Sequence, residues 1–242
     1  MNENKIRGFV NDDDKVFGSI AIPKLKTAQE ELHFLLDRGY PMKSAMTFVG
    51  NHHQLTVRQA LAVVRAAASQ RNLALRKEKQ RDEIKGQTVY IDGFNIIITL
   101  EVALSDGMLF VGQDGCIRDL AELRGSYRLI PQTDKAIVLI RDALSKLEAG
   151  SVVFYLDQPV SNSGRLRAKI YEIDWPMFVT VNITRRPDVL LKKLPCVVTG
   201  DFIILDECES WYNMTAYILN QAGLWRSQTR LIRLNGEMPC AT

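Results

Sequence analysis

Three short apolar segments in the second part of the chain each lead into an aspartate. TVYID ends at Asp92, VVFYLD ends at Asp157, and CVVTG is followed directly by Asp201 and runs on through FIILD to Asp206. β-Branched and aromatic residues dominate these segments, which predicts strands, as does a fourth segment at residues 177–182. Helical patterns lie between and after them, over residues 97–104, 133–149, 164–172 and 213–220. Strands that alternate with helices favour a mostly parallel sheet covered by helices on both faces, so we predict an α/β domain over residues 86–242.

The first part of the chain shows helical patterns only. Three helices are predicted, one from Thr27 to Gly39 and two over residues 42–49 and 57–68. Thr27 stands where an N-cap is expected, because Glu30 follows three residues later as in a capping box, and Thr56 is expected to cap the third helix. Residues 1–26 are polar and irregular and predict an arm ahead of the helices. We therefore predict a small all-α domain over residues 1–85.

Charge is divided unevenly between these two parts. Residues 1–85 hold 15 Lys and Arg against 10 Asp and Glu, a net charge of +5, whereas the remainder holds 16 against 18, a net charge of −2. The segment at residues 71–85 is highly charged and, taken alone, is typical of a solvated connector or an exposed helix. The arginines and lysines of this segment, together with two earlier arginines, are also suited to a phosphate-tracking stripe that follows the backbone of a nucleic acid. They are Arg58, Arg65, Arg71, Arg76, Lys77, Lys79, Arg81 and Lys85.

The composition excludes several classes of protein. Hydrophobic residues make up 46% of the 242 residues and charged residues 24%, which is ordinary for a globular chain and unlike a disordered or coiled-coil one. No apolar stretch approaches the roughly 20 residues of a membrane span, and the N-terminus has no signal-peptide core, so we expect a cytoplasmic protein. The four cysteines include no CxxC pair and are expected to be buried thiols.

The positions of the three aspartates suggest a shared chemistry. The carboxyl ends of parallel strands meet at one edge of a sheet, where ligands bind. Carboxylates gathered there repel one another unless cations neutralise them, and oxygen-rich sites favour Mg²⁺ or Mn²⁺. A single aspartate after a strand is more often a turn or cap residue, but three in equivalent positions indicate a metal site.

The same segments resemble the PIN-like nucleases, particularly their NYN branch. TVYIDGFNIII resembles the first strand of that superfamily, so the resemblance implies that Asp92 is a metal-binding carboxylate and Asn95 its polar companion. VVTGDFIILD resembles a later strand whose S/T-G-D string supplies Asp201, and VVFYLD resembles the intervening strand with Asp157 at its tip. Asp188 in RPDVLL matches the acidic position on the preceding helix.

Over most of residues 28–220, the chain also resembles an uncharacterised prokaryotic family that joins a small helical domain to a PIN-like domain. The segments that carry this resemblance are LLDRGYPMKSAMTFVGNHHQLTVRQ, DGCIRDLAEL and LDQPVSNSGRL. One departure concerns the fourth acidic ligand. Asp188 follows Pro187 and is also placed to cap a helix, which leaves Asp206 as the alternative.

The SNSGR string directly after Asp157 allows two interpretations. Backbone amides and the side chains of Ser161, Asn162, Ser163 and Arg165 suit a phosphate at a helix N-terminus. The same string is also typical of a serine-capped helix with its arginine in solvent. Both interpretations stay open at the level of the sequence.

Other polar residues have mainly structural interpretations. Arg118 and Asp119 either form an exposed ion pair, which is the commoner case, or both reach the edge of the site. A structural role is expected for Asp119, whereas Asp114 remains undecided. The neighbouring His52 and His53 diverge by about 100° in a helix, so a surface loop is expected there rather than a metal site.

These observations lead to one functional hypothesis with two alternatives. The hypothesis is a nuclease that hydrolyses RNA with Mg²⁺ or Mn²⁺ held by Asp92, Asp157, Asp201 and Asp188, while Asn95 orients a ligand or water. The helical domain would help to hold RNA, no membrane is involved, and homo-oligomers are allowed. The alternatives are a non-catalytic module that binds RNA or protein, and a metal-dependent phosphatase.

Overall fold

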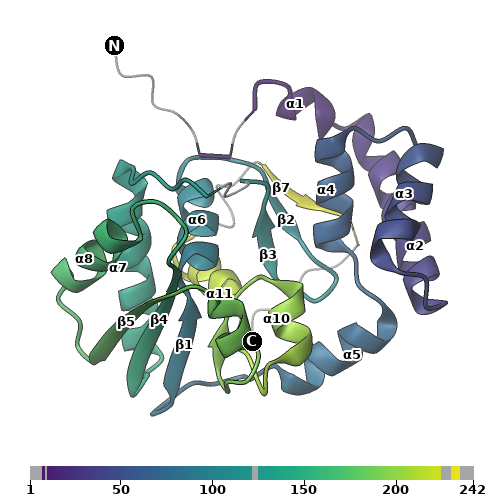
Figure 1. The fold of residues 1–242 in the computed structure, drawn as a ribbon. Coiled ribbons are helices and arrows are strands. Elements are labelled where there is room, and N and C mark those ends of the chain that lie inside the picture. Colours follow the sequence, from purple (N-terminus) through teal and green to yellow (C-terminus); the bar gives the residue numbers. More distant parts are fainter. Residues whose placement is uncertain (1–6, 9, 122–124, 225–229, 235–242) are drawn as a thin grey trace.

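A four-stranded parallel sheet organises the C-terminal part of the chain and lies at the lower left of Figure 1. The computed structural model describes residues 7–8, 10–121, 125–224 and 230–234. The strands of this sheet are β1 (Thr88–Asp92), β4 (Ser151–Asp157), β5 (Phe178–Thr184) and β6 (Val197–Val198). They are ordered β5-β4-β1-β6, and every neighbouring pair is parallel. The mostly parallel α/β sheet predicted from the sequence is confirmed.

The strand order creates a switch point between β1 and β6. The chain moves outward from β1 to β4 and β5, and then returns to place β6 on the opposite side of β1. Connections on the two sides of β1 therefore leave in opposite directions, and a crevice opens outside the carboxyl ends of β1 and β6. Asp92 is the last residue of β1, and Asp201 follows β6 after two residues.

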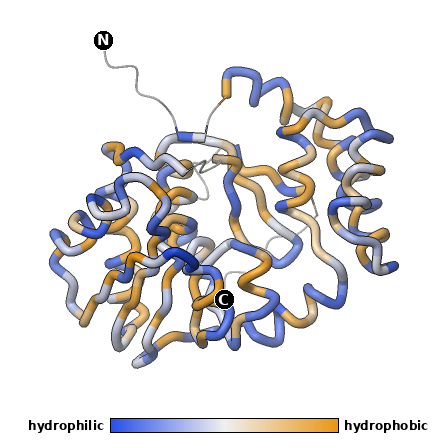
Figure 2. The backbone as a smooth tube through the Cα atoms, viewed as in Figure 1, coloured by the Kyte–Doolittle hydropathy of each residue, from blue (hydrophilic) through white to orange (hydrophobic). Residues whose placement is uncertain are grey.

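One face of the sheet is buried more completely than the other. Helices α6 (Gly93–Leu104), α7 (Pro131–Lys146), α8 (Ser163–Glu172) and α11 (Met214–Gln221) share a core with the fully buried side chains of β1 and β4. The opposite face packs on the short helices α9 (Pro187–Leu191) and α10 (Phe202–Glu207) and on Trp211, with Tyr90 and Tyr155 partly buried there. This difference follows the alternation of buried and partly buried residues along β1 and β4. Figure 2 shows hydrophobic stretches of the chain in the region of this sheet. Helices thus cover both faces, as predicted, but they do so unequally.

The N-terminal part is helical, as predicted. It comprises α1 (Asp13–Val16), α2 (Ala21–Asp37), α3 (Met42–His52), α4 (Val57–Ala66) and α5 (Gln70–Lys79). The predicted cap at Thr56 is confirmed, and the structure shows that it forms a capping box with Gln59. The predicted start at Thr27 was wrong, because α2 begins at Ala21 and the Thr27 hydroxyl donates to the Pro23 carbonyl within the helix. A proline is tolerated in a first turn, where backbone N–H groups have no intrahelical acceptor, so the segment expected to be an irregular arm already contains α1 and the start of α2.

A second, three-stranded sheet joins the two parts of the chain. It consists of β2 (Leu109–Val111), β3 (Ile117–Asp119) and β7 (Leu231–Arg233), in the order β3-β2-β7, and lies between α4 and the main sheet in Figure 1. Phe110 of β2 packs in one core with Leu25 and Val49 of the helical part. The helical part therefore has no separate core of its own, and none of these strands was predicted.

Helix α5 is docked on the α/β part rather than solvated. Arg76 is only 2% exposed, and its guanidinium pairs with Asp114 and Asp206 at 2.7 Å each. The Trp211 indole donates to the Arg76 carbonyl, which ties the same helix to the loop after α10. The helix that was one of the two expectations for residues 71–85 is present and exposes Arg71 and Lys77, but Arg76 anchors it, so it is not a free connector.

Most cations of the expected phosphate-tracking stripe are used inside the molecule. Those with intramolecular partners are Arg58 with Asp13, Arg65 with Asp119, Arg76 with Asp114 and Asp206, Lys79 with the Asp206 carbonyl, Arg81 with Ser210, and Lys85 with Glu148. Arg71 and Lys77 are exposed. The structure thus gives these cations a role in holding the two parts together. In the described part of the chain, no helix is sufficiently long and apolar to cross a membrane.

The cysteines of the described residues are unpaired and inaccessible. Cys116, Cys196 and Cys208 are buried free thiols, as predicted, and Cys240 lies outside the described residues. Burial raises the pKa of Cys196 and Cys208 to about 11, so these thiols stay protonated at neutral pH.

Candidate functional site

A cavity of about 350 Å³ opens at the carboxyl ends of β1 and β6. Asp92, Asp157 and Asp201 all line it, so the structure brings the three predicted aspartates to one site. Its other polar side chains are Arg65, Asn95, Thr99, Arg118 and Asp119, and apolar ones include Phe94, Ile98 and Ile117. Arg65 comes from α4, so the helical part also contributes to the wall.

The turns after β1 and β6 hold each other in place. The Thr199 hydroxyl donates to Asp92 Oδ2 at 2.8 Å, and the Gly200 N–H donates to Asn95 Oδ1 at 2.6 Å. A Cβ atom at Gly200 would lie 3.2 Å from that same Asn95 oxygen, so glycine permits this close approach. Asn95 is thus engaged through its carbonyl oxygen, and its predicted contact with a ligand or water stays a prediction.

The acidic side chains at the cavity influence the pKa of one another. Burial raises the pKa of Asp92 to about 7, and the carboxylates of Asp201 and Asp157 act in the same direction, against the hydrogen bond from Thr199. Burial also raises the pKa of Asp157, and Asp188 adds to that rise. The negative charges therefore lie close enough to disfavour simultaneous ionisation.

No ion pair within the residues that the structure describes relieves this repulsion. None of Asp92, Asp157, Asp188 and Asp201 forms one with a lysine or arginine there. The arginines that line the cavity are paired elsewhere, Arg65 with Asp119 and Arg118 with Asp114. Oxygen donors with charge that no direct partner compensates suit a hard divalent cation such as Mg²⁺ or Mn²⁺.

The carboxylates are nevertheless not drawn together into a closed cage. In the described ranges, only Glu31, His52 and His53 bring three ligand atoms within 4.8 Å of one another. Asp201 also accepts a hydrogen bond at Oδ1 from the Ile203 N–H at 2.7 Å, as the N-cap of α10. Mg²⁺ is commonly held by one or two carboxylates with several waters, so spaced carboxylates remain compatible with such an ion.

The structure separates the two candidates for the fourth acidic ligand. Both oxygens of Asp206 are engaged, one by Asn72 at 2.9 Å and the other by Arg76 at 2.7 Å. Asp188 is exposed on α9 and lies outside the cavity lining, but it raises the pKa of Asp157 and therefore adjoins the site. Of the two, Asp188 has its carboxylate available.

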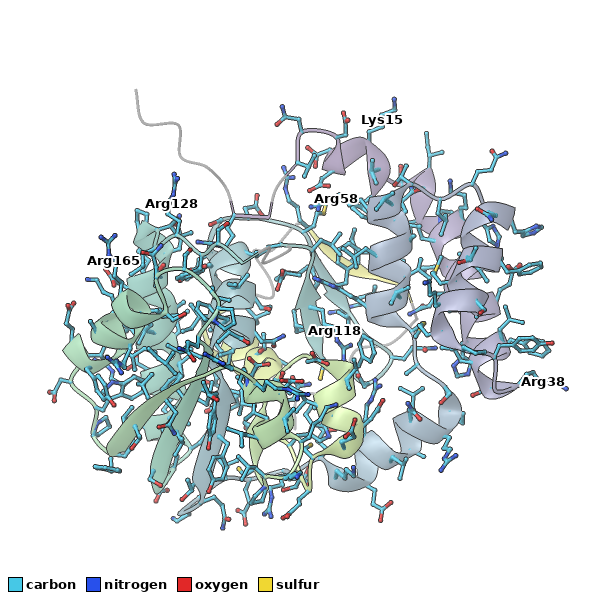
Figure 3. The ribbon with its side chains drawn as sticks, in the orientation of Figure 1. Lys15, Arg38, Arg58, Arg118, Arg128 and Arg165 are labelled. Atoms are coloured by element: carbon cyan, nitrogen blue, oxygen red, sulfur yellow. The ribbon has the colours of Figure 1, made fainter. Side chains whose placement is uncertain are left out.

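Of the two alternatives for Arg118 and Asp119, the exposed pair was wrong, and both residues line the cavity. Arg118 is buried and binds both oxygens of Asp114, at 2.9 and 2.6 Å, while its Nε donates to the Gly200 carbonyl. Burial alone would raise the pKa of Asp114, but Arg118 and Arg76 outweigh it and lower the pKa to about 2. Figure 3 shows Arg118 between the main sheet and the helical part, where it supports the turn that carries Asp201.

Asp119 instead turns toward the cavity. Its Oδ2 accepts from the Thr99 hydroxyl at 2.6 Å and its Oδ1 accepts from the Ala121 N–H at 2.7 Å. A position at the edge of the site was one of the two alternatives for Asp119, whereas Thr99 was not predicted to line a cavity. Asp119 lies on β3 and Thr99 on the second turn of α6, and no local sequence pattern predicts that these two elements meet at the cavity.

The SNSGR residues lie outside the cavity lining. Ser161 and Asn162 both donate to the Tyr127 carbonyl, and the Ser163 hydroxyl bonds to the carbonyls of Asp157 and Val160. Arg165 is exposed and points away from the molecule in Figure 3. These side chains shape the turn after β4, and a phosphate role for them stays a prediction.

Two exposed arginines at the same edge of the sheet were not predicted as site residues. Arg185 and Arg186 follow β5 directly, and the Gln158 N–H donates to the Thr184 carbonyl, so the turn after β4 lies beside them. The signal that identified Asp157 would have found them as well, since both positions follow a strand of the same parallel sheet.

The comparisons with known proteins place this architecture in a family. Residues 81–217 match the family described as a domain of unknown function, DUF5616. The chain belongs to this family. Residues 24–79 match a second family, described as a protein of unknown function, DUF434. The uncharacterized protein MJ0935 of Methanocaldococcus jannaschii is 34% identical over 189 residues, which cover 75% of this chain and 88% of that protein. No match was found among solved structures.

Proposed function

We propose that this protein is a metal-dependent nuclease with a PIN-like α/β domain that hydrolyses phosphodiester bonds in RNA. The observation that supports it is the convergence of Asp92, Asp157 and Asp201 on one cavity at the switch point of the sheet, without an ion pair to any of them among the described residues. Such a site attracts a divalent cation and, with it, a phosphate group.

The aspartates would hold the ion, with Asp188 as an outer partner. A bound divalent cation supplies a Lewis acid for the phosphoryl oxygens and a position for an attacking water. Asp92 gives up its proton when the ion enters, because its raised pKa reflects burial and repulsion that a cation relieves. The hydrogen bonds of Thr199 and Asn95 would hold the turns after β1 and β6, which carry Asp92 and Asp201, in place while the charge at the site changes.

Contacts to RNA would come from arginines at the same edge of the sheet. Arg185 and Arg186 are exposed beside the turn that follows Asp157. Arg65 lines the cavity from the helical part, although it also contacts Asp119. These residues replace most of the stripe expected at residues 58–85 as the candidates for phosphate contacts.

The decisive test is cleavage of single-stranded RNA with Mn²⁺. We expect Asp92→Asn and Asp201→Asn each to lower the rate by about a hundredfold or more, since each removes a carboxylate from the ion. Asp142→Asn is the matched control, because the Asp142 side chain on α7 is 48% exposed and lies outside the cavity lining. Cleavage that both cavity variants leave unchanged would rule out this site.

A non-catalytic RNA- or protein-binding module is the second candidate. The separation of the carboxylate oxygens in the cavity favours it, because they do not gather three ligand atoms within 4.8 Å. Calorimetry with Mn²⁺ distinguishes the two. Absence of Mn²⁺ uptake together with retained RNA binding supports the module, whereas turnover of small phosphomonoesters in preference to RNA indicates a phosphatase.

A further inference from the structure

A second group of metal-ligating side chains lies on the helical part, away from the aspartate cavity. It consists of Glu31 on α2, His52 at the end of α3 and the following residue His53. Each contributes one ligand atom, and these three atoms lie within 4.8 Å of one another. The expected surface loop was wrong, because His52 belongs to α3, and the two imidazoles converge on one carboxylate instead of diverging.

The end of α3 explains how two adjacent histidines share a partner. His52 is the last helical residue and His53 is the C-cap, so the second imidazole is no longer constrained by a continuing helix. Gln54 has a φ of 49°, and the Leu55 N–H returns to the Gly50 carbonyl at 2.9 Å, which closes the helix end as a Schellman-type turn. The ring centroids of His52 and His53 are 4.8 Å apart, and Glu31 reaches them from the neighbouring helix α2.

Part of the ligand geometry is already formed. His53 Nε2 lies 2.7 Å from Glu31 Oε2, and the His53 side chain is 13% exposed, so this pair is held in a defined position. The His52 ring is stacked near the Phe48 ring, with an interplanar angle of 4° and centroids 6.4 Å apart. Because His52 is exposed and the Glu31 side chain is 38% exposed, an ion from solvent has access to both.

We propose that Glu31, His52 and His53 bind one transition-metal ion of the Zn²⁺ class. Two imidazoles and one carboxylate form a borderline-soft donor set that Zn²⁺ prefers and that Mg²⁺ does not. Three protein ligands leave a coordination position for water. An ion between the three ligand atoms would replace the hydrogen bond between His53 and Glu31, and rotation of these surface side chains would bring each ligand atom into contact with it.

The surroundings of the trio leave room for the hydrated ion. Glu31 and His52 line a groove of about 470 Å³ between α2 and α3, together with Glu30, Phe34, Leu35 and Phe48. An ion bound there would link α2 to the end of α3, and would thus stabilise the packing of these helices.

Titration of the tag-free protein with Zn²⁺ tests the proposal directly. The chain has only three histidines, so NMR can follow each imidazole separately. We expect one equivalent of Zn²⁺ to shift the signals of His52 and His53 and to leave those of His33, which pairs with Asp37, in place. A wild-type protein whose His52 and His53 signals do not move would overturn the proposal.

Variants separate this site from the aspartate cavity. His52→Ala and Glu31→Gln should each weaken Zn²⁺ binding by at least about tenfold, since loss of even an outer-shell partner typically costs 10–100-fold. Glu30→Gln removes the adjacent carboxylate in the same groove and should leave the Zn²⁺ affinity of the histidine site, followed through the His53 signals, within about twofold. Asp92→Asn should leave that affinity unchanged to the same degree. His52 is exposed, and unchanged circular dichroism of His52→Ala will verify its fold. Wild-type affinity in that variant contradicts the assignment.

Discussion

At the scale of single residues, the protonation of Asp92 depends on the negative charges of the neighbouring aspartates in the cavity. Its carboxylate accepts a hydrogen bond from Thr199 at 2.8 Å, which favours ionisation, yet burial and two neighbouring aspartates outweigh this and place its pKa at about 7. A carboxyl group that titrates near neutral pH in a cavity is a marker of a functional site, because a purely structural cap has no reason to retain this repulsion.

The raised pKa of Asp92 predicts how stability changes with pH. The pKa of Asp92 is 3.8 in the unfolded chain and about 7 in the folded protein, so between these pH values the folded protein holds a proton that the unfolded chain has released. The free energy of unfolding therefore falls as the pH rises through this range, and the loss is complete above about pH 7. Asp92→Asn removes the ionisable group and therefore this pH-dependent loss of stability. We therefore expect its stability, relative to wild type, to improve from about pH 5 to about pH 8 in urea denaturation with a chelator present.

Two further measurements complete this test. Asp142→Asn, at a half-exposed side chain of α7, should show a difference from wild type that does not vary over the same pH range. Addition of Mn²⁺ at about pH 8 should stabilise wild type more than Asp92→Asn, because binding to the folded state adds to its stability. A constant difference between Asp92→Asn and wild type at all pH values would contradict the assigned pKa.

The residues of the cavity differ in how well the sequence predicts them. Asp92, Asp157 and Asp201 were predictable because each follows a strand, and parallel strands bring their ends together. For the adjacent residues Arg118 and Asp119, the sequence left an exposed ion pair and a place at the edge of the site as alternatives. Alternation along β3 sends their side chains in opposite directions, so that Arg118 pairs with Asp114 whereas Asp119 accepts from Thr99.

At the scale of elements, α5 is a charged helix that is fixed by one buried arginine. Arg76 bridges Asp114, which precedes β3, and Asp206, which lies on α10. The Asp114 side chain is 1% exposed and also binds Arg118, so two guanidinium groups share one buried carboxylate. Burial of these charges is tolerated only because each is paired and hydrogen-bonded.

Loss of Arg76 should therefore be costly. Arg76→Ala leaves Asp206 without its ion-pair partner and Asp114 with one guanidinium in place of two, so we expect unfolding to become easier by about 3–5 kcal/mol. Arg71→Ala provides the matched control on the same helix, because Arg71 is exposed, and its effect should stay within about 0.5 kcal/mol. Chemical denaturation measures both. Equal effects would show that α5 is not anchored through Arg76.

The strands of the main sheet were predicted, including the two-residue β6 inside a longer apolar segment, whereas the strands of the second sheet were not. β1 and β4 have enough residues to show alternation, whereas β2, β3 and β7 have three residues each and depend on pairing with distant segments. The residues of α10 were expected to continue an apolar strand after Val198, yet the Asp201 side chain caps the first turn and starts a helix instead. Local propensity is weak evidence where a segment is short and tertiary contacts decide its conformation.

At the scale of the whole molecule, the two parts of the chain share structure across the expected boundary. The helices α2 to α4 pack on β2 and β7 in one core, and Phe17 meets Phe110 edge to face with centroids 5.0 Å apart. Arg65 of α4 reaches Asp119 at the cavity. The matches to two families meet between residues 79 and 81, but the packing does not divide there. We infer that the cavity depends on the helical part for one wall.

This continuity predicts one cooperative unfolding transition for the molecule. Phe110 is fully buried in the core that contains the helices, so Phe110→Ala should lower the free energy of unfolding by about 3–5 kcal/mol. If the molecule unfolds as a unit, hydrogen exchange in α2 and in β4 will lose protection by the same free energy, although β4 belongs to a different core cluster. Phe178→Ala is the control, because Phe178 is 75% exposed on β5 and should change protection little in either element. Loss of protection confined to α2, with β4 unchanged, would instead show two independently stable parts, and the wall that Arg65 adds to the cavity would then belong to a separable domain.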